Sequence, residues 1–300
     1  MTELFSENFL ISKTDEDLDN LQAQYPTYDR YYIASGSISD RKKFFNEMYE
    51  KFKPYADSHF LIEAKTNFHQ RVWEMYMACV LIKNGLTIVS NNKGPDIKLV
   101  IGGKTVWIEC VAPKKGEKDN ENSVPDIKYG VVQDLPEKQM LFRLRNSLDE
   151  KFKVYEKYLS DGIVKKDDIF IIAINRASLD HTDPGIPLIF KALFSIGFLS
   201  FPIKKLKEEG NSKFGKPSWT LRSVVPKGNG SEVSMNFFQN PNHAGISAVI
   251  YSKNSVLSCR AKTGEECVLT HNPLATNPLS EQVFPFFEQY RATDDKIIKI

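Results

Sequence analysis

Two acidic side chains, Asp96 and Glu109, flank a glycine pair that predicts a tight turn. Gly102-Gly103 separates two runs rich in β-branched and apolar residues, a pattern typical of a two-residue β-hairpin. If Ile101 pairs with Lys104, counting back along both strands places Asp96 directly opposite Glu109. Side chains opposed in this way share one face of a sheet, with Cβ atoms about 5 Å apart. Two carboxylates so placed repel each other.

A divalent cation between the two carboxylates would replace this repulsion with coordination. The alternative is a solvated strand edge that tolerates two acids. The neighbouring residues Trp107, Ile108 and Val111 are typical of a buried strand. This context favours the metal site over the solvated edge.

A third acid, Glu74, stands alone in the predicted helix Asn67–Asn84, which is apolar on nearly all its faces. A buried carboxylate needs a polar partner or a metal ion. One interpretation is an ion pair with Arg71, three residues earlier on the helix. The other is a role in the same site as Asp96. We predict that the Glu74 carboxylate points towards Asp96 and not towards Arg71.

The segment after Val111 is polar, contains Pro and Gly, and shows no periodicity up to about residue 135. A loop of this length inside a compact domain is typically functional or mobile. Lys114 and Lys115 lie at its base, where they can reach a bound phosphate. Ordinary lysines on a solvated loop are the alternative interpretation.

A second long helix is predicted over Pro136–Leu159. Arg143, Ser147 and Lys151 follow one another at intervals of four residues, so they stack on one face beside the apolar stripe. A stripe that is cationic and can donate hydrogen bonds suits a helix beside an anionic site. An amphipathic boundary with long side chains reaching for solvent is the alternative.

These candidate residues lie on a predicted order of helix, three strands, helix and strand. The first strand is Leu86–Ser90, the hairpin supplies the next two, and the last is the buried strand Ile169–Ile174. A helical crossover into that last strand implies a parallel neighbour. We expect an N-terminal helical cap over 1–65, a core over 66–178 and a C-terminal extension over 179–300 packed on the core.

The flanking segments give weaker signals. In the cap, Arg41–Lys53 has apolar residues at helical spacing. In the extension, the patterns predict a helix over Pro187–Phe194, strands over Ser234–Phe238, Ile246–Tyr251 and Glu266–Leu269, and a turn segment over His271–Leu279.

Composition sets wider bounds. The chain has 300 residues, 41% of them hydrophobic, which is enough for one large core or two modest domains. The net charge of +2 neither demands nor excludes a nucleic-acid partner. Cys79, Cys110, Cys259 and Cys267 show no CxxC spacing and are expected to be reduced thiols of a cytoplasmic protein. Neither a signal peptide nor a transmembrane helix is expected.

The predicted order of elements, with Pro95-Asp96 on one strand and Glu109 on the next, resembles the PD-(D/E)xK superfamily of nucleases. Its core is αβββαβ, a mixed central sheet flanked by helices, and the resemblance covers about Asn67–Asn175. The chain is also similar to uncharacterised bacterial restriction-endonuclease-like proteins. The resembling segments are VWIECVAPKKG, the LFRLRNSLDEK helix followed by IFIIAIN, and HNPLATNPL.

The resemblance implies a nuclease that uses Mg²⁺ or Mn²⁺, with Asp96 and Glu109 as metal ligands beside the main-chain carbonyl of Cys110 or Val111. Glu74 matches an additional glutamate of the family, which would hold a water of the ion or a second ion. Hard oxygen ligands favour these cations, which polarise a phosphodiester oxygen and lower the pKa of the attacking water.

The chain departs from the family at Val111, which stands where the motif has lysine. Members of the family can carry this lysine on a neighbouring element, and Lys151 is the first candidate because a helix holds it rigidly. Lys114 and Lys115 are the next candidates.

The resemblance further implies DNA or RNA as the partner, with Lys114, Lys115, Arg143, Ser147 and Lys151 close to phosphates. It is compatible with a homodimer and implies no membrane partner. Because Val111 replaces the lysine, two alternatives stay open. One is a degenerate member that binds nucleic acid or a protein without cutting. The other is an interaction protein with a structural metal site.

Overall fold

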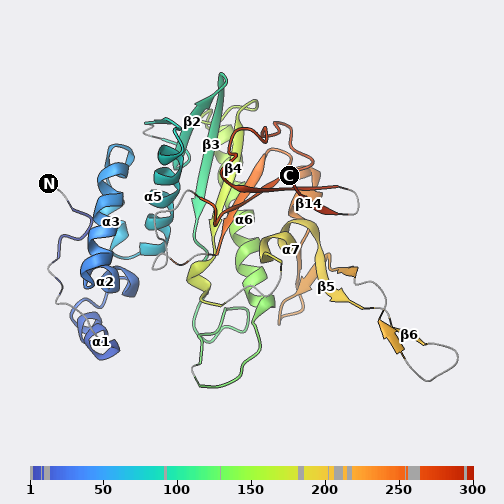
Figure 1. Cartoon of the computed structure of the whole chain (residues 1–300), viewed down its shortest axis with the longest axis horizontal. Helices are drawn as coiled ribbons and strands as arrows, with labels where there is room; N and C mark the ends of the chain where they lie inside the picture. The colour runs from blue at the N-terminus through green and yellow to red at the C-terminus, as the bar shows by residue number, and fades with distance from the viewer. Residues whose placement is uncertain are drawn as a thin grey trace.

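A computed structural model of the chain describes residues 3–7, 9, 14–90, 93–128, 130–181, 186–201, 203–205, 212–214, 218–253, 255, 264–293 and 296–300. Cys259, predicted to be a reduced thiol, lies outside these residues, whereas Cys79, Cys110 and Cys267 are free thiols. The described chain forms a mixed α/β structure with a large central sheet flanked by helices (Figure 1).

The sheet of the described residues has eight strands in the order β1-β2-β3-β4-β11-β12-β13-β14. Their bounds are β1 Ile88–Val89, β2 Ile97–Ile101, β3 Lys104–Val111, β4 Ile169–Asn175, β11 Ala248–Ser252, β12 Val268–His271, β13 Glu288–Ala292 and β14 Ile297–Lys299. β3 and β4 are parallel, as are β4 and β11, and β12 and β13; the other neighbours are antiparallel. The predicted parallel neighbour of β4 is thereby confirmed.

The β2–β3 hairpin has the predicted register. Ile101 pairs with Lys104, and the two-residue turn places both glycines at positive φ, 57° and 79°. The ladder ends at the pair Ile97 and Ile108, however, so Asp96 lies in the bend just before β2 and not within the strand. β3 continues past that point and pairs with β4 up to Val111.

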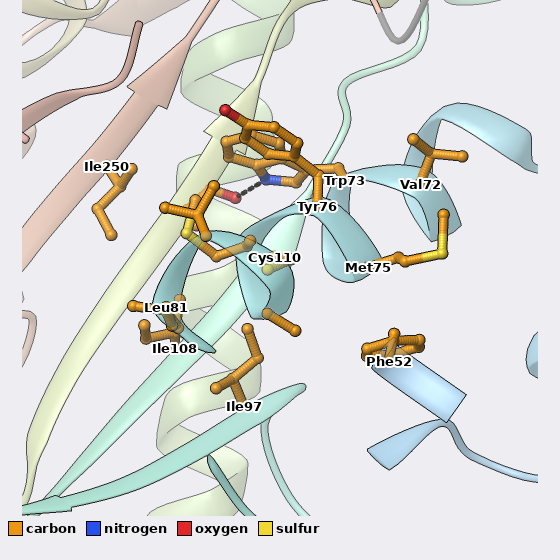
Figure 2. Packing of buried hydrophobic residues seen from close by; sticks show 14 of the residues in the cluster. Phe52, Val72, Trp73, Met75, Tyr76, Leu81, Ile97, Ile108, Cys110 and Ile250 are labelled. Atoms are coloured by element: carbon orange, nitrogen blue, oxygen red, sulfur yellow. Dashed lines mark hydrogen bonds between the residues drawn. The ribbon is translucent and has the colours of Figure 1, made fainter. Parts of the chain in front are cut away.

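Two long helices, α5 Phe68–Lys83 and α6 Glu137–Ser160, pack on opposite faces of the sheet. Alternate residues of β3 separate accordingly: Ile108 joins the core on the α5 side, and Trp107 joins the core on the α6 side. Trp73 of α5 donates from its indole nitrogen to the main-chain carbonyl of Ala173 in β4, at 2.9 Å. Figure 2 shows Trp73 stacked with Tyr76 over the sheet.

The ends of both helices follow local rules. Gly85 has φ +80° directly after α5, and its N–H and that of Leu86 bond to the carbonyls of Ile82 and Leu81. This pattern closes a helix with a left-handed glycine, as predicted. Gly162, with φ +69°, follows α6 in the same way. Asn67 is the N-cap of α5, but its side chain makes no capping bond.

The N-terminal segment is helical. Its helices are α1 Asp15–Gln24, α2 Arg30–Gly36, α3 Ser39–Phe52, the 3₁₀ helix η1 Lys53–Tyr55 and α4 Phe60–Ala64. Of these, α2, α3 and α4 contact α5, and α1 contacts α2 (Figure 1). Asp29 links them to α5: it caps α2 by accepting from Tyr31 N at 2.8 Å, and it accepts from Phe68 N at 3.0 Å.

One hydrophobic cluster contains residues of all three predicted segments, including Phe45, Val72 and Phe287. The predicted boundaries at 65 and 178 stay predictions.

The C-terminal part differs from the predictions in two places. The predicted strand Ser234–Phe238 is wrong, because strand β10 covers Glu232–Ser234 and Phe237–Gln239 forms the 3₁₀ helix η3. His271 belongs to β12 and not to a turn.

The predicted helix over 187–194 is confirmed as α7 Leu188–Phe194. The remaining elements are β5 Ile196–Ser200, β6 Ile203–Lys205, β7 Ser212–Phe214, β8 Ser218–Leu221, β9 Val224–Pro226, and the 3₁₀ helices η2 Ala177–Leu179 and η4 Pro241–His243. Within the described part of the chain, no helix is both long and apolar enough to cross a membrane.

Candidate functional site

Four predicted site residues lie at the carboxyl end of β3 on four different elements. Glu74 comes from α5, Asp96 from the bend before β2, Glu109 from β3 and Lys151 from α6. The site therefore forms where the hairpin meets both helices. The following contacts define how these side chains are held.

Glu109 and Lys151 form an ion pair, with 2.6 Å between Oε1 of the carboxylate and Nζ of the ammonium. The Glu109 side chain is 6% exposed and the Lys151 side chain 21%. The second carboxylate oxygen of Glu109, Oε2, is buried and has no hydrogen-bond partner among the described residues. One acceptor of this acid is thus satisfied by the lysine, and the other is open.

Asp96 contacts β3 directly. Its Oδ2 accepts a hydrogen bond of 2.7 Å from the backbone N–H of Cys110. The carboxylate thus takes the place that a continuing β2 strand would have held on β3. This bond fixes Asp96 against the strand that carries Glu109.

Glu74 is 5% exposed, and both of its oxygens are engaged. Oε1 accepts from Nε2 of Gln70 at 2.8 Å, and Oε2 accepts from Arg71 at 2.7 Å. The prediction that Glu74 points away from Arg71 is wrong, because the guanidinium folds back over the helix and is itself only 12% exposed. Arg71 also binds the carboxylates of Asp57 and Glu63.

The pKa of each of the three acids is raised, and burial is the first cause in every case. Burial, and then the charge of Asp96, raises the pKa of Glu74 to about 8 against the opposing effect of Arg71. Burial and the charge of Asp96 likewise raise the pKa of Glu109 to about 7, against the effect of Lys151. The pKa of Asp96 is also raised, by burial above all, although Lys151 and the N–H of Cys110 oppose the shift.

The lysine responds in the opposite sense. Burial lowers the pKa of Lys151, but the carboxylates of Glu109 and Asp96 outweigh burial, and the net shift is upward. Lys151 is therefore a cation at neutral pH. Three acids share this lysine and Arg71 as nearby cations, so the cluster is poor in positive charge.

The predicted phosphate contacts have other partners in the structure. Lys115 is paired with Asp126 at 2.6 Å and with Asp180 at 2.7 Å. Arg143 donates to the carbonyl of Asn122 in the loop after β3. Lys114 is exposed. These contacts brace the loop, and they do not bring Lys115 or Arg143 into contact with the three carboxylates. Ser147 is 7% exposed on α6.

Two residues of the site were missed by the sequence reasoning. The first is Gln70, which bonds to Glu74 and to β3. The second is Tyr158, whose pKa is raised by burial and then by the charges of Glu109 and Asp96. Gln70 lies four residues before Glu74, and Tyr158 lies seven residues after Lys151. Both spacings place the residue on the same helix face as its site neighbour, a signal that was available in the sequence.

Within the described ranges, no three His, Cys, Asp or Glu side chains are arranged so that together they could hold a metal ion. Lys151 binds one carboxylate oxygen of Glu109. Arg71 and Gln70 bind the two oxygens of Glu74, so these three oxygens already have a partner where a cation would bind. Oε2 of Glu109 remains without a hydrogen-bond partner among the described residues, and Oδ2 of Asp96 accepts from the N–H of Cys110.

Comparison of the chain with known protein families, with curated proteins and with solved structures finds no match. The site must therefore be interpreted from its own chemistry.

Proposed function

We propose that the chain is a metal-dependent phosphodiesterase that cleaves DNA or RNA, built on a restriction-endonuclease-like PD-(D/E)xK core. The observation that carries the proposal is the gathering of Glu74, Asp96 and Glu109 at the carboxyl end of β3, where burial raises the pKa of all three acids and the charge of Asp96 further raises the pKa of both glutamates. Such a cluster is stable only if cations or protons compensate it. The order α5, β1, β2, β3, α6, β4 also supports the proposal.

The oxygens that we assign to a hard divalent cation belong to two carboxylates and one main-chain carbonyl. Carboxylate and main-chain carbonyl oxygens are the ligands that Mg²⁺ and Mn²⁺ prefer. The buried Oε2 of Glu109, which lacks a hydrogen-bond partner among the described residues, is an acceptor that a cation would satisfy. Asp96 and Glu109 would hold the ion together with the carbonyl of Cys110, and Glu74 would lie at the border of the site.

A bound cation would supply polarisation of the phosphodiester and a lower pKa for water. Lys151 stands on a rigid helix, and its ammonium can stabilise negative charge that develops on the phosphate. Glu74, with a pKa of about 8, exchanges a proton close to neutral pH, which suits a group that accepts a proton from water. Gln70 and Arg71 hold that carboxylate in one orientation.

A second candidate is a protein of the same fold that binds nucleic acid or a protein partner without cleaving it. Two observations favour it. Lys151 already neutralises Glu109, so the pair is stable without a metal. Val111 stands where the nuclease motif has its lysine.

Cleavage assays distinguish the two candidates. The purified chain is incubated with supercoiled plasmid, single-stranded DNA and single-stranded RNA, in Mg²⁺, in Mn²⁺ and in EDTA. We expect cleavage that EDTA abolishes and that falls by about 10²-fold or more in Asp96→Asn and Glu109→Gln. Asp134→Asn, which changes an exposed acid of the loop, is the matched control and should retain full activity.

The result that would overturn the proposal is specific. If the wild-type chain cleaves none of these substrates with either metal but retards them in a gel, the second candidate is correct. If cleavage survives both Asp96→Asn and Glu109→Gln, the activity belongs to another site.

A further inference from the structure

The edge of β3 beyond the hairpin ladder is completed by side chains. β2 stops pairing at Ile108, yet β3 continues to Val111. Because β2 ends early, the N–H and C=O of Cys110 and the N–H of Ala112 have no partner in that strand. Buried backbone groups of this kind need partners. Asp96 accepts from the N–H of Cys110, and one glutamine, Gln70 of α5, binds the other two groups.

The contacts of Gln70 use both ends of its amide. Nε2 donates to the carbonyl of Cys110 at 3.0 Å and to Oε1 of Glu74 at 2.8 Å, while Oε1 accepts from the N–H of Ala112 at 2.7 Å. The opposite orientation of the amide would place its oxygen against two acceptors and its NH₂ against a donor. The surroundings therefore fix the orientation of the amide.

This bridge joins two parts of the candidate site that come from different elements. One is the carboxylate of Glu74 on α5, and the other is the carbonyl of Cys110 on β3. Since Gln70 lies one helical turn before Glu74, the same face of α5 presents both side chains.

We propose that Gln70 is a positioning residue, which holds the Glu74 carboxylate at a fixed distance from the carboxyl end of β3 and keeps it oriented for cleavage. The catalytic consequence rests on the proposed function, whereas the bridge between Gln70 and Glu74 can be tested without it. The polar atoms of the Gln70 side chain are all bonded to other groups of the protein, so Gln70 acts through Glu74 and Cys110.

The two hydrogens of the Gln70 NH₂ both meet acceptors, so a side chain without them leaves Glu74 and Cys110 unpaired on that side. A carboxylate that loses a charge-assisted hydrogen bond is easier to protonate. Gln70→Ala removes the donor, and Gln70→Glu keeps the shape but places an oxygen against the two acceptors. Both changes should raise the pKa of Glu74, and Gln70→Glu should raise it more.

The primary experiment is a carbon-detected NMR titration of the glutamate side-chain carboxyl groups in the full-length, metal-free chain. The Glu74 signal is assigned by its loss in Glu74→Gln. We expect its midpoint to move upward by about one pH unit in Gln70→Ala, the size expected for a hydrogen bond to a charged group. The control is Gln289→Glu, which changes a buried glutamine that bridges Glu281, Phe284 and His271 elsewhere in the fold. It should lower the melting temperature without moving the midpoint.

Cleavage assays add the catalytic readout. If the wild type cleaves, Gln70→Ala should reduce kcat by about tenfold or more with little change in KM, and the pH profile of kcat should shift in the direction of the Glu74 titration. If the wild type does not cleave, the proposed function fails, and the NMR shift alone still supports the bridge. The proposal is overturned if Gln70→Ala lowers the melting temperature as Gln289→Glu does but leaves the Glu74 titration unchanged.

Discussion

The ammonium of Lys151 lies 2.6 Å from Oε1 of Glu109, and this ion pair ties α6 to the strand that carries the predicted metal ligand. Because Glu109 is nearly buried and Lys151 is partly exposed, the pair is neither a free surface contact nor a fully desolvated one. A pair of this kind stabilises the fold mainly by preventing an uncompensated buried charge.

Replacing the lysine should therefore have an effect that depends on pH. Lys151→Met leaves Glu109 buried without its cation, and we expect a loss of about 1–3 kcal/mol in the free energy of unfolding at pH 9, the cost of an unsatisfied buried group. At pH 6 Glu109, with a pKa of about 7 even beside Lys151, takes up a proton, so the loss should be smaller. Urea denaturation at both pH values measures the difference. An equal loss at pH 6 and pH 9 would contradict the assignment of the effect to the charge of Glu109.

The raised pKa values also predict how stability of the metal-free protein varies with pH. The pKa of Glu109 rises to about 7 and that of Glu74 to about 8, from a usual value of 4.5. The folded state thus binds more protons than the unfolded state between about pH 4.5 and pH 8, and the contribution of these acids falls as pH rises through that window. We expect a lower melting temperature at pH 8.5 than at pH 6.

The variant Asp96→Asn supplies the control for this pH dependence. After burial, the charge of Asp96 is the next contribution to the raised pKa of both glutamates. Its removal should flatten the profile between pH 6 and pH 8.5. A steeper profile in Asp96→Asn than in the wild type would show that other groups control the stability in this range.

Metal binding should release protons. With pKa values of about 8 and about 7, Glu74 and Glu109 are mostly protonated at pH 6.5, and coordination or a nearby cation favours their charged forms. Calorimetric titration with Mn²⁺ in buffers of different ionisation enthalpy counts the protons released. We expect about one proton or more at pH 6.5 and close to none at pH 9.5. Binding heats that do not depend on the buffer at pH 6.5 would argue against a site made of these acids.

Asp29 should be more important to stability than a typical helix cap. It accepts from Tyr31 N at the start of α2 and from Phe68 N at the start of α5. One cap contributes about 0.5–2 kcal/mol, so Asp29→Ala should lower the free energy of unfolding by about 2–3 kcal/mol. Asp29→Asn, which keeps one carbonyl oxygen, should lose about half as much.

The comparison for this prediction is Thr14→Ala, which removes the side-chain cap of the exposed helix α1. Its loss should stay near the lower end of the range for a single cap. Chemical denaturation of the three variants tests the order Asp29→Ala, Asp29→Asn, Thr14→Ala.

Local signals in the sequence were sufficient for the hairpin and the long helices. Gly102-Gly103 determined the register, and Gly85 and Gly162 marked the ends of α5 and α6, because glycine lacks a Cβ and adopts a positive φ without steric cost. The strand predicted over 234–238 failed because its apolar residues are buried by a 3₁₀ turn, which alternation cannot distinguish from a short strand.

The site was only partly accessible to the same reasoning. The register brought Asp96 close to Glu109, but where β2 ends depends on the bend at 94–96 and not on the turn. The pairing of Lys115 with Asp180, 65 residues further along the chain, and the bonds from Gln70 to Cys110 and Ala112 arise from the packing of distant segments. No local pattern encodes such contacts.

The early end of β2 has a consequence for hydrogen exchange at the edge of the sheet. The amide protons of Cys110 and Ala112 are held by the side chains of Asp96 and Gln70, and not by a neighbouring strand. Their exchange with deuterium therefore reports the docking of α5 and of the bend, whereas the amides of β3 within the ladder report the sheet. An opening that separates α5 from the sheet breaks the bond between Gln70 and the N–H of Ala112 but none of the backbone bonds between β2 and β3, so the candidate site can come apart while the hairpin that carries Glu109 stays intact.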